Sequence, residues 1–116
     1  MEFEGLWCVR FEAGQAWGYG HVVFTGGKIL GGDSWWRYVG QYQIASDQAQ
    51  MMVRIAPTPR GFVRPAHESQ RRLNVLGHLT PYDLRFDLLL DDLAAGAIEF
   101  AAGRNGERKV AMQKII

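Results

Sequence analysis

The sequence has only one cysteine, Cys8, so it excludes an internal disulfide and a zinc site built from several cysteines. Charge of one sign is not in excess either, because 13 Lys and Arg against 12 Asp and Glu leave a formal charge of +1. A nearly neutral chain has no net field that would draw it to a nucleic-acid backbone or an anionic membrane. We therefore expect neither partner, and we interpret Cys8 as a buried thiol without a catalytic role.

Long hydrophobic runs are also missing. The first residues, Met1 to Gly5, lack the basic start and apolar stretch of a secretory signal, and no run reaches the length of a membrane span. These absences predict a cytoplasmic protein. With 116 residues, 47% of them hydrophobic, the chain is expected to fold as one domain, 1–116, around one core.

What the sequence does contain is alternation of apolar and polar residues with a period of two, which is typical of half-buried strands. Turn signals such as Gly26-Gly27, Ser46-Asp47-Gln48 and Asn105-Gly106 separate the alternating runs. Residues 57–71, rich in proline and arginine, predict one long surface loop, and at most a short helix is expected. The expected strands cover 6–11, 19–23, 35–44, 51–55, 73–76, 84–90, 97–102 and 110–112.

Eight short strands with this spacing predict an all-β fold, either a barrel or a sandwich. The segment Gly31-Gly32-Asp33 falls between a short strand and the long one at 35–44, and a strand that bends sharply while keeping its pairing uses glycines at the corner. We expect Asp33 to accept hydrogen bonds from the backbone amides of this bend. Gly40 continues the same glycine-rich pattern further along the strand.

Several of these segments together resemble a known family. Gly5 with Trp7 and Val9, then Gly18 to Gly20, then "GKILGGD" followed by "YVGQY", are similar to the negative regulators of type III secretion, the GrlR-like proteins. The resemblance implies a closed, eight-stranded, antiparallel lipocalin-like (calycin) barrel, which forms a homodimer. It also implies a non-enzymatic regulatory protein that sequesters a protein partner such as a transcription activator. In that family an acidic turn grips the activator, whereas the matching turn here has one acid, Asp47.

A second interpretation of function starts from the aromatic residues. An eight-stranded barrel is just wide enough to be filled by side chains or to hold one small ligand. The aromatic residues at alternating strand positions either pack this interior or line a pocket for a small apolar or amphiphilic ligand, as in a carrier or sensor. The candidate lining residues are Trp7, Tyr19, Trp36, Tyr38, Tyr42, Phe86 and Phe100.

Candidate partner-binding residues lie on the other face of the third strand. Trp35 and Arg37 alternate with Trp36, and tryptophan and arginine often anchor protein interfaces. Together with Asp47 they form the predicted contact surface. A basic cluster in the long loop either binds an acidic partner or is simply solvated: Arg60, Arg64, Arg71 and Arg72.

No pattern of catalytic or metal-binding residues stands out. The three histidines, His21, His67 and His78, share no ligand spacing, so no metal or other cofactor is expected. The serines lack a nucleophile-elbow pattern, and Asp87, Asp91 and Asp92 are interpreted as a strand end and a solvated turn. We therefore predict that the protein is not an enzyme.

Overall fold

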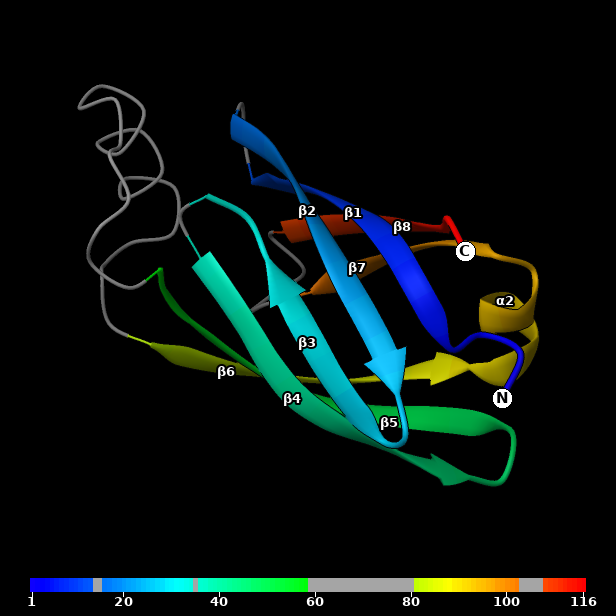
Figure 1. Ribbon diagram of the computed structural model, residues 1–116. Coiled ribbons are helices and arrows are strands. Elements are labelled where there is room, and N and C mark those ends of the chain that lie inside the picture. Colours follow the sequence, from blue (N-terminus) through cyan, green and yellow to red (C-terminus); the bar gives the residue numbers. More distant parts are fainter. Residues whose placement is uncertain (14–15, 35, 59–80, 103–107) are drawn as a thin grey trace.

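The computed structural model describes residues 1–13, 16–34, 36–58, 81–102 and 108–116 (Figure 1). In these residues eight strands form one antiparallel sheet, in the order β6-β5-β4-β3-β2-β1-β8-β7. One short helix, α2, follows β6 in the described part of the chain. The elements are β1 (Gly5–Ala13), β2 (Ala16–Thr25), β3 (Lys28–Gly32), β4 (Trp36–Ala45), β5 (Gln48–Pro57), β6 (Tyr82–Leu89), α2 (Leu90–Ala94), β7 (Ala97–Ala102) and β8 (Arg108–Lys114).

The sheet is strongly curled into a half-barrel that does not close. β6 and β7 are its edges, and no backbone pairing joins them within the described residues. A tight turn would let these strands pair as a hairpin, but α2 stands between them in the chain. Phe86 on β6 instead stacks on Phe100 on β7, with the ring centroids 4.9 Å apart. The predicted all-β fold of eight antiparallel strands is confirmed, and the predicted closed barrel is wrong.

The two ends of the half-barrel differ (Figure 1). At one end, called here the helix end, lie α2, both chain termini and the two-residue turns at 26–27 and 46–47. Phe3 and Leu93 are 2% and 0% exposed and fill this end. At the opposite end, called the far end, β1, β3, β5 and β7 finish and the other four strands begin.

The segment Gly31-Gly32-Asp33 connects a short strand to a long one, as predicted, but it reverses the chain, so the predicted bend of a continuing strand is wrong. β3 and β4 are antiparallel neighbours, with Gly31 opposite Tyr38. The Asp33 carboxylate accepts hydrogen bonds from the backbone N–H of Trp36 at 2.8 Å and from the Tyr38 hydroxyl at 2.9 Å. Alternation alone cannot separate a bent strand from two strands joined by a short turn, because both keep the period of two.

Two inward-facing glycines allow the sheet to curl. A Cβ atom added at Gly31 would overlap the carbonyl oxygen of His21 on β2 and lie 2.8 Å from the Cα of Val22. One added at Gly40 would overlap the carbonyl of Met52 on β5 and lie 2.9 Å from the Cα of Val53. Carbon atoms pack best at about 3.5–4.0 Å, so the neighbouring strands approach too closely for any side chain. Both positions therefore require glycine.

The inward-facing side chains form the hydrophobic core. The larger cluster, centred on Trp7, Met51 and Leu93, fills the helix end, and none of the described polar or charged residues is fully buried. A smaller cluster contains Trp36 and Tyr38, packed against Val53 and Ile55 at the far end. The curl therefore separates a packed helix end from a far end that holds fewer buried residues.

Some predictions fall on residues that the structure does not describe. These are the strand at 73–76, the Asn105-Gly106 turn, and the long loop at 57–71 apart from Pro57 and Thr58. In the described part, α2 has five residues, in keeping with the expectation of at most a short helix. No helix of the described residues is long and apolar enough to cross a membrane.

Candidate functional site

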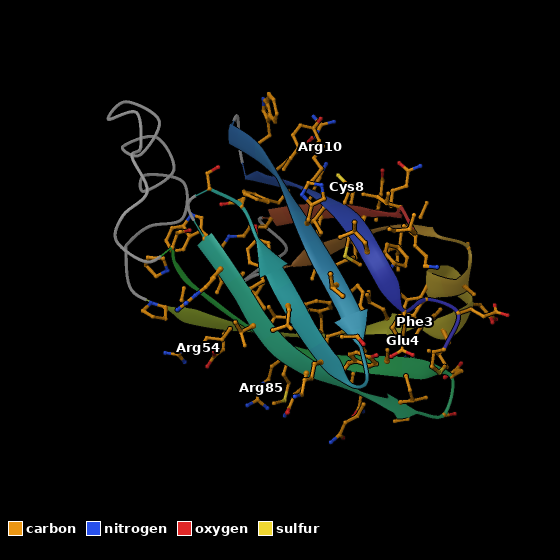
Figure 2. All side chains as sticks on the ribbon, in the orientation of Figure 1. Phe3, Glu4, Cys8, Arg10, Arg54 and Arg85 are labelled. Carbon is orange, nitrogen blue, oxygen red and sulfur yellow. The ribbon has the colours of Figure 1, made fainter. Side chains whose placement is uncertain are left out.

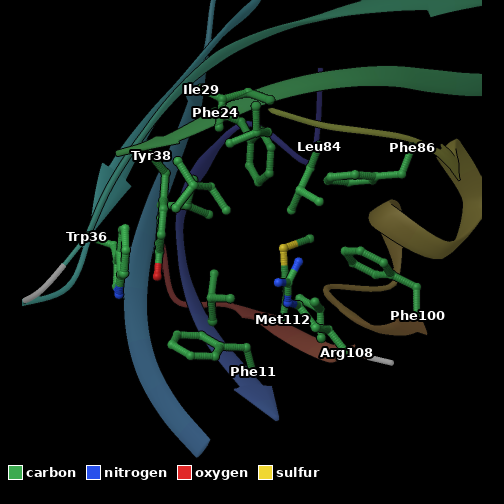
Figure 3. A pocket seen from close by; sticks show the side chains of 15 residues that line it. Phe11, Phe24, Ile29, Trp36, Tyr38, Leu84, Phe86, Phe100, Arg108 and Met112 are labelled. Carbon is green, nitrogen blue, oxygen red and sulfur yellow. The ribbon is translucent and has the colours of Figure 1, made fainter. Parts of the chain in front are cut away.

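An apolar pocket of about 100 Å³ lies on the concave face of the sheet (Figure 3). Each strand of the described sheet contributes at least one inward-facing side chain to it, and members of both core clusters take part. The lining residues are Val9, Phe11, Val22, Phe24, Ile29, Trp36, Tyr38, Val53, Ile55, Leu84, Phe86, Phe100, Arg108, Val110 and Met112.

The size of the pocket limits what it can hold. One water molecule needs a cavity volume of about 10–15 Å³, and an apolar cavity of about 150 Å³ is large enough to bind benzene. The volume here, about 100 Å³, is smaller than that, so the pocket encloses a short hydrocarbon chain or part of a ring. Because aliphatic and aromatic side chains make up nearly all of the lining, transfer of an apolar group from water into this space is favourable.

The structure brings four of the seven predicted lining residues to the pocket: Trp36, Tyr38, Phe86 and Phe100. Trp7 and Tyr42 are buried, but they lie in the packed cluster at the helix end and do not line the pocket. The indole N–H of Trp7 donates to the carbonyl of Phe3 at 2.7 Å, which fixes this ring under the N-terminal segment. Trp7 and Tyr42 therefore pack the closed end of the half-barrel.

The prediction that Tyr19 points into the barrel is wrong. Its side chain is 51% exposed and lies on the convex face, opposite Arg10. The inward positions beside it on β2 are Gly18 and Gly20, and the ring of Tyr38 covers Gly20, within 3.2 Å of where a Cβ would be. Because glycines occupy the inward face here, the outward tyrosine dominates the sequence pattern and was assigned to the wrong face.

Arg108 is a pocket residue that the sequence pattern alone did not single out. It begins β8, where Arg108, Val110 and Met112 face inward at alternate positions. Figure 3 shows the Arg108 side chain pointing into the space that the other labelled pocket residues surround. The alternation with two apolar residues was the signal that could have placed this arginine on the concave face. Within the described residues, it is the one charged side chain of the pocket lining.

The far end of the pocket also carries a fixed acidic group. Asp33 lies in the turn before β4 and holds the hydroxyl of the lining residue Tyr38. Its second oxygen accepts from the backbone of Trp36, another lining residue. The carboxylate therefore holds the Tyr38 side chain and the backbone of Trp36, which come from one strand of the pocket wall.

A second hydrogen-bond network closes the helix end (Figure 2). The Glu4 carboxylate accepts from the amino group of Met1 at 2.8 Å, from the Tyr42 hydroxyl, and from the Gly26 N–H at 2.7 Å. These three donors, the amino group first, lower the pKa of Glu4 from 4.5 to about 2. Burial, and then the hydrogen bond to Glu4, raise the pKa of Tyr42. The network ties the N-terminal segment to the turn between β2 and β3.

A cluster of exposed aromatic residues lies on the convex face, near the far end. The Arg10 guanidinium lies 5.7 Å from the centroid of the Trp17 ring and 5.8 Å from that of Tyr19. The two rings meet edge to face with their centroids 5.3 Å apart. Trp17 is 58% exposed, so most of this aromatic surface contacts solvent. We call these three residues the convex cluster.

The residues predicted to form one partner-binding surface do not come together. Arg37 is exposed near the start of β4, and Asp47 is exposed in the turn after this strand. They are ten positions apart in the sequence, which corresponds to about 33 Å along a strand. Trp35 lies outside the described residues. Arg54 and Arg85, labelled in Figure 2, also point away from the pocket.

Chemistry-bearing side chains do not gather elsewhere in the described part of the chain. No group of three or more His, Cys, Asp or Glu side chains there could hold a metal ion. Cys8 is half-buried, and His21 is exposed on the convex face, opposite Cys8. His67 and His78 lie outside the described residues. The concave pocket is therefore the strongest candidate site.

In comparisons with known proteins, no family model matches the chain and no curated protein is significantly similar to it. The resemblance to the negative regulators of type III secretion therefore stays a prediction from the sequence.

Proposed function

We propose that this protein is a non-enzymatic binding protein that holds a small apolar or amphiphilic molecule in its concave pocket, as a carrier or sensor. The observation that carries the proposal is the pocket lining, to which all eight described strands contribute and in which fourteen of the fifteen residues are aliphatic or aromatic. A wall built from many strands holds its shape, and an apolar interior selects ligands by hydrophobic transfer.

The pocket position of Trp36 gives a direct signal for binding. Its side chain is 3% exposed and belongs to the pocket wall, so a ligand changes the surroundings of this indole. Titration with octan-1-ol, monitored by tryptophan fluorescence and by calorimetry, tests the proposal. We expect a saturable change with one site per chain. Native mass spectrometry of the purified protein, compared with the denatured mass, tests whether a ligand is retained from the cell.

A matched pair of variants locates the binding site. Val53→Phe adds a ring to the pocket wall, whereas Val39→Phe adds the same ring on the convex face, where Val39 is 48% exposed. We expect the first variant to weaken octanol binding by about tenfold or more, while the second binds like the unmodified protein. Equal affinities for the two variants, with both folded by circular dichroism, would place the binding outside the pocket and refute the proposal.

A second candidate function is the regulatory one, in which the protein sequesters a protein partner. The convex cluster supports it, because arginine, tryptophan and tyrosine are the residues that most often dominate interface energies. Leu30 and Val39, which are direct cross-strand partners, are also exposed on the convex face, at 46% and 48%. A homodimer is the simplest use of such a surface, and a transcription activator is the partner that the family resemblance implies.

Sedimentation and affinity capture separate these uses of the convex face. If the face forms a homodimer, Trp17→Ala and Val39→Asp should shift the sedimenting species toward the monomer. If it binds another protein, a partner retained by the unmodified chain should be lost with Trp17→Ala and kept with Gln41→Ala, another exposed position. The regulatory candidate is refuted if the unmodified protein sediments as a monomer and retains the same proteins as the Trp17→Ala variant.

A further inference from the structure

We infer that the ligand of the concave pocket carries one anionic headgroup, and that Arg108 binds it. This inference rests on the proposed function, because it assigns the chemical class of the ligand for the same pocket. Within the described lining, Arg108 is the one charged residue among fourteen aliphatic and aromatic ones. The pocket therefore matches a molecule with an apolar body and a single negative group, such as a short-chain or aryl-substituted carboxylate.

The position of Arg108 in the strand explains how the cation reaches the pocket. β8 runs from the far end to the helix end, and its inward residues are Arg108, Val110 and Met112, in that order. Arg108 pairs with Ala13 on one side and with Ala102 on the other. Lys109, the next residue, faces the convex side and is exposed. The strand thus directs one cation inward at the far end and one outward beside it.

The layout along the barrel axis fits an amphiphile lying lengthwise. The helix end is packed with Phe3, Trp7 and Leu93, so a ligand body can extend only as far as the pocket floor above them. Arg108 is the first residue of β8, so it lines the pocket at the far end. An apolar tail directed toward the helix end thus leaves its headgroup at the level of the guanidinium.

Arginine is well suited to this role. Its guanidinium stays charged at all relevant pH values and presents parallel N–H donors that match the two oxygens of a carboxylate. A charge-assisted pair inside an apolar pocket is stronger than one in water. The acidic group at the same end, Asp33, is held by the Tyr38 hydroxyl and the Trp36 backbone N–H. Asp33 is thus part of the turn before β4.

A headgroup series with a common tail tests the inference. The unmodified protein is titrated with octanoate, octan-1-ol and octylamine, and binding is followed by calorimetry and tryptophan fluorescence. A titration with 3-phenylpropanoate distinguishes an aryl from an alkyl body. We expect both carboxylates to bind at least about tenfold tighter than octanol, and octylamine to bind weakest. Arg108→Gln should remove this preference and leave octanol binding unchanged. Arg108→Lys should keep part of it, and Lys109→Gln, the matched surface control, should change nothing.

The outcomes separate the two proposals. If octanoate, octanol and octylamine bind the unmodified protein equally, the pocket binds ligand but the assignment to Arg108 is wrong. The assignment is also wrong if Arg108→Gln weakens octanol and octanoate by the same factor, or if Lys109→Gln has the larger effect. If none of the four probes binds, both the proposed function and this inference fail. Arg108→Glu provides a positive check, because a folded variant should prefer octylamine.

Discussion

Replacement of Gly40 by alanine is the most direct test of how this sheet curls. The added methyl group would overlap the carbonyl oxygen of Met52 and lie 2.9 Å from the Cα of Val53, about 1 Å closer than carbon atoms prefer. Both atoms belong to the backbone of β5, so no side-chain rotation can relieve the clash. Either β5 moves away from β4, or the local curl opens.

The cost has two parts. Forcing an extra methyl group into a tightly packed site typically costs about 1–3 kcal/mol, and each weakened ladder hydrogen bond adds about 0.5–1.5 kcal/mol. Alanine recovers about 0.4–1 kcal/mol, because it has less conformational freedom than glycine in the unfolded chain. With one ladder bond weakened, we expect Gly40→Ala to lower the free energy of unfolding by about 0.5–4 kcal/mol, compared with the roughly 5–15 kcal/mol of a typical domain.

Urea denaturation, followed by circular dichroism and tryptophan fluorescence, measures this loss, and thermal unfolding should show a midpoint lowered by roughly 2–16 °C. Gln41→Ala is the control, because this neighbouring side chain is exposed and its truncation should cost less than about 0.5 kcal/mol. If Gly40→Ala is as stable as Gln41→Ala, the close approach of β5 to β4 does not require glycine, and the explanation of the curl is wrong.

Further predictions concern the helix end, the stacked rings between β6 and β7, and the convex face. Because the folded pKa of Glu4 is lowered from 4.5 to about 2, its stabilising contribution is complete above pH 4.5 and is lost as the pH falls toward 2. Unfolding of Glu4→Gln in urea should therefore depend less on pH in this window, and equal slopes would contradict the network. Leucine substitutions of Phe86 and Phe100 in a double-mutant cycle should give a coupling of about 0.5–1.5 kcal/mol, whereas no coupling would exclude the stack. Trp17→Ala should change stability by less than about 1 kcal/mol, since the ring is 58% exposed, and a larger loss in the same urea assay would contradict its placement.

Much of the fold could be predicted from the sequence, because alternation and turn residues are local signals. The two-residue turns at 26–27 and 46–47 lie where glycine and the Ser-Asp pair predicted them. Whether a sheet closes depends on the pairing of β6 with β7, and that depends on how the chain crosses between them. The sequence of α2, Leu90–Ala94, is too short to carry a clear helical period, so its effect on closure could not be foreseen.

The candidate site was only partly predictable for a related reason. Large aromatic residues at alternating strand positions predict the interior of the fold, and Trp36 and Phe100 do line the pocket. It failed for Tyr19, because an inward face made of glycine carries no hydrophobic signal. Arg108 precedes the predicted strand at 110–112, so the alternation of that strand does not include it. Only the parity of the neighbouring strand residues indicates its direction, and parity is certain once the register is known.

The seam between β6 and β7 has a consequence for how the interior can change over time. In a cylinder closed by hydrogen bonds, the number of strands and their stagger determine the circumference, so the interior widens only when a strand is inserted or the register shifts. Here two stacked rings, Phe86 and Phe100, span the gap, and both also face the pocket. A single substitution at either position should therefore change both the separation of β6 from β7 and the volume of the pocket. The chamber of this protein is thus adjustable by point mutation, without a change in its strand architecture.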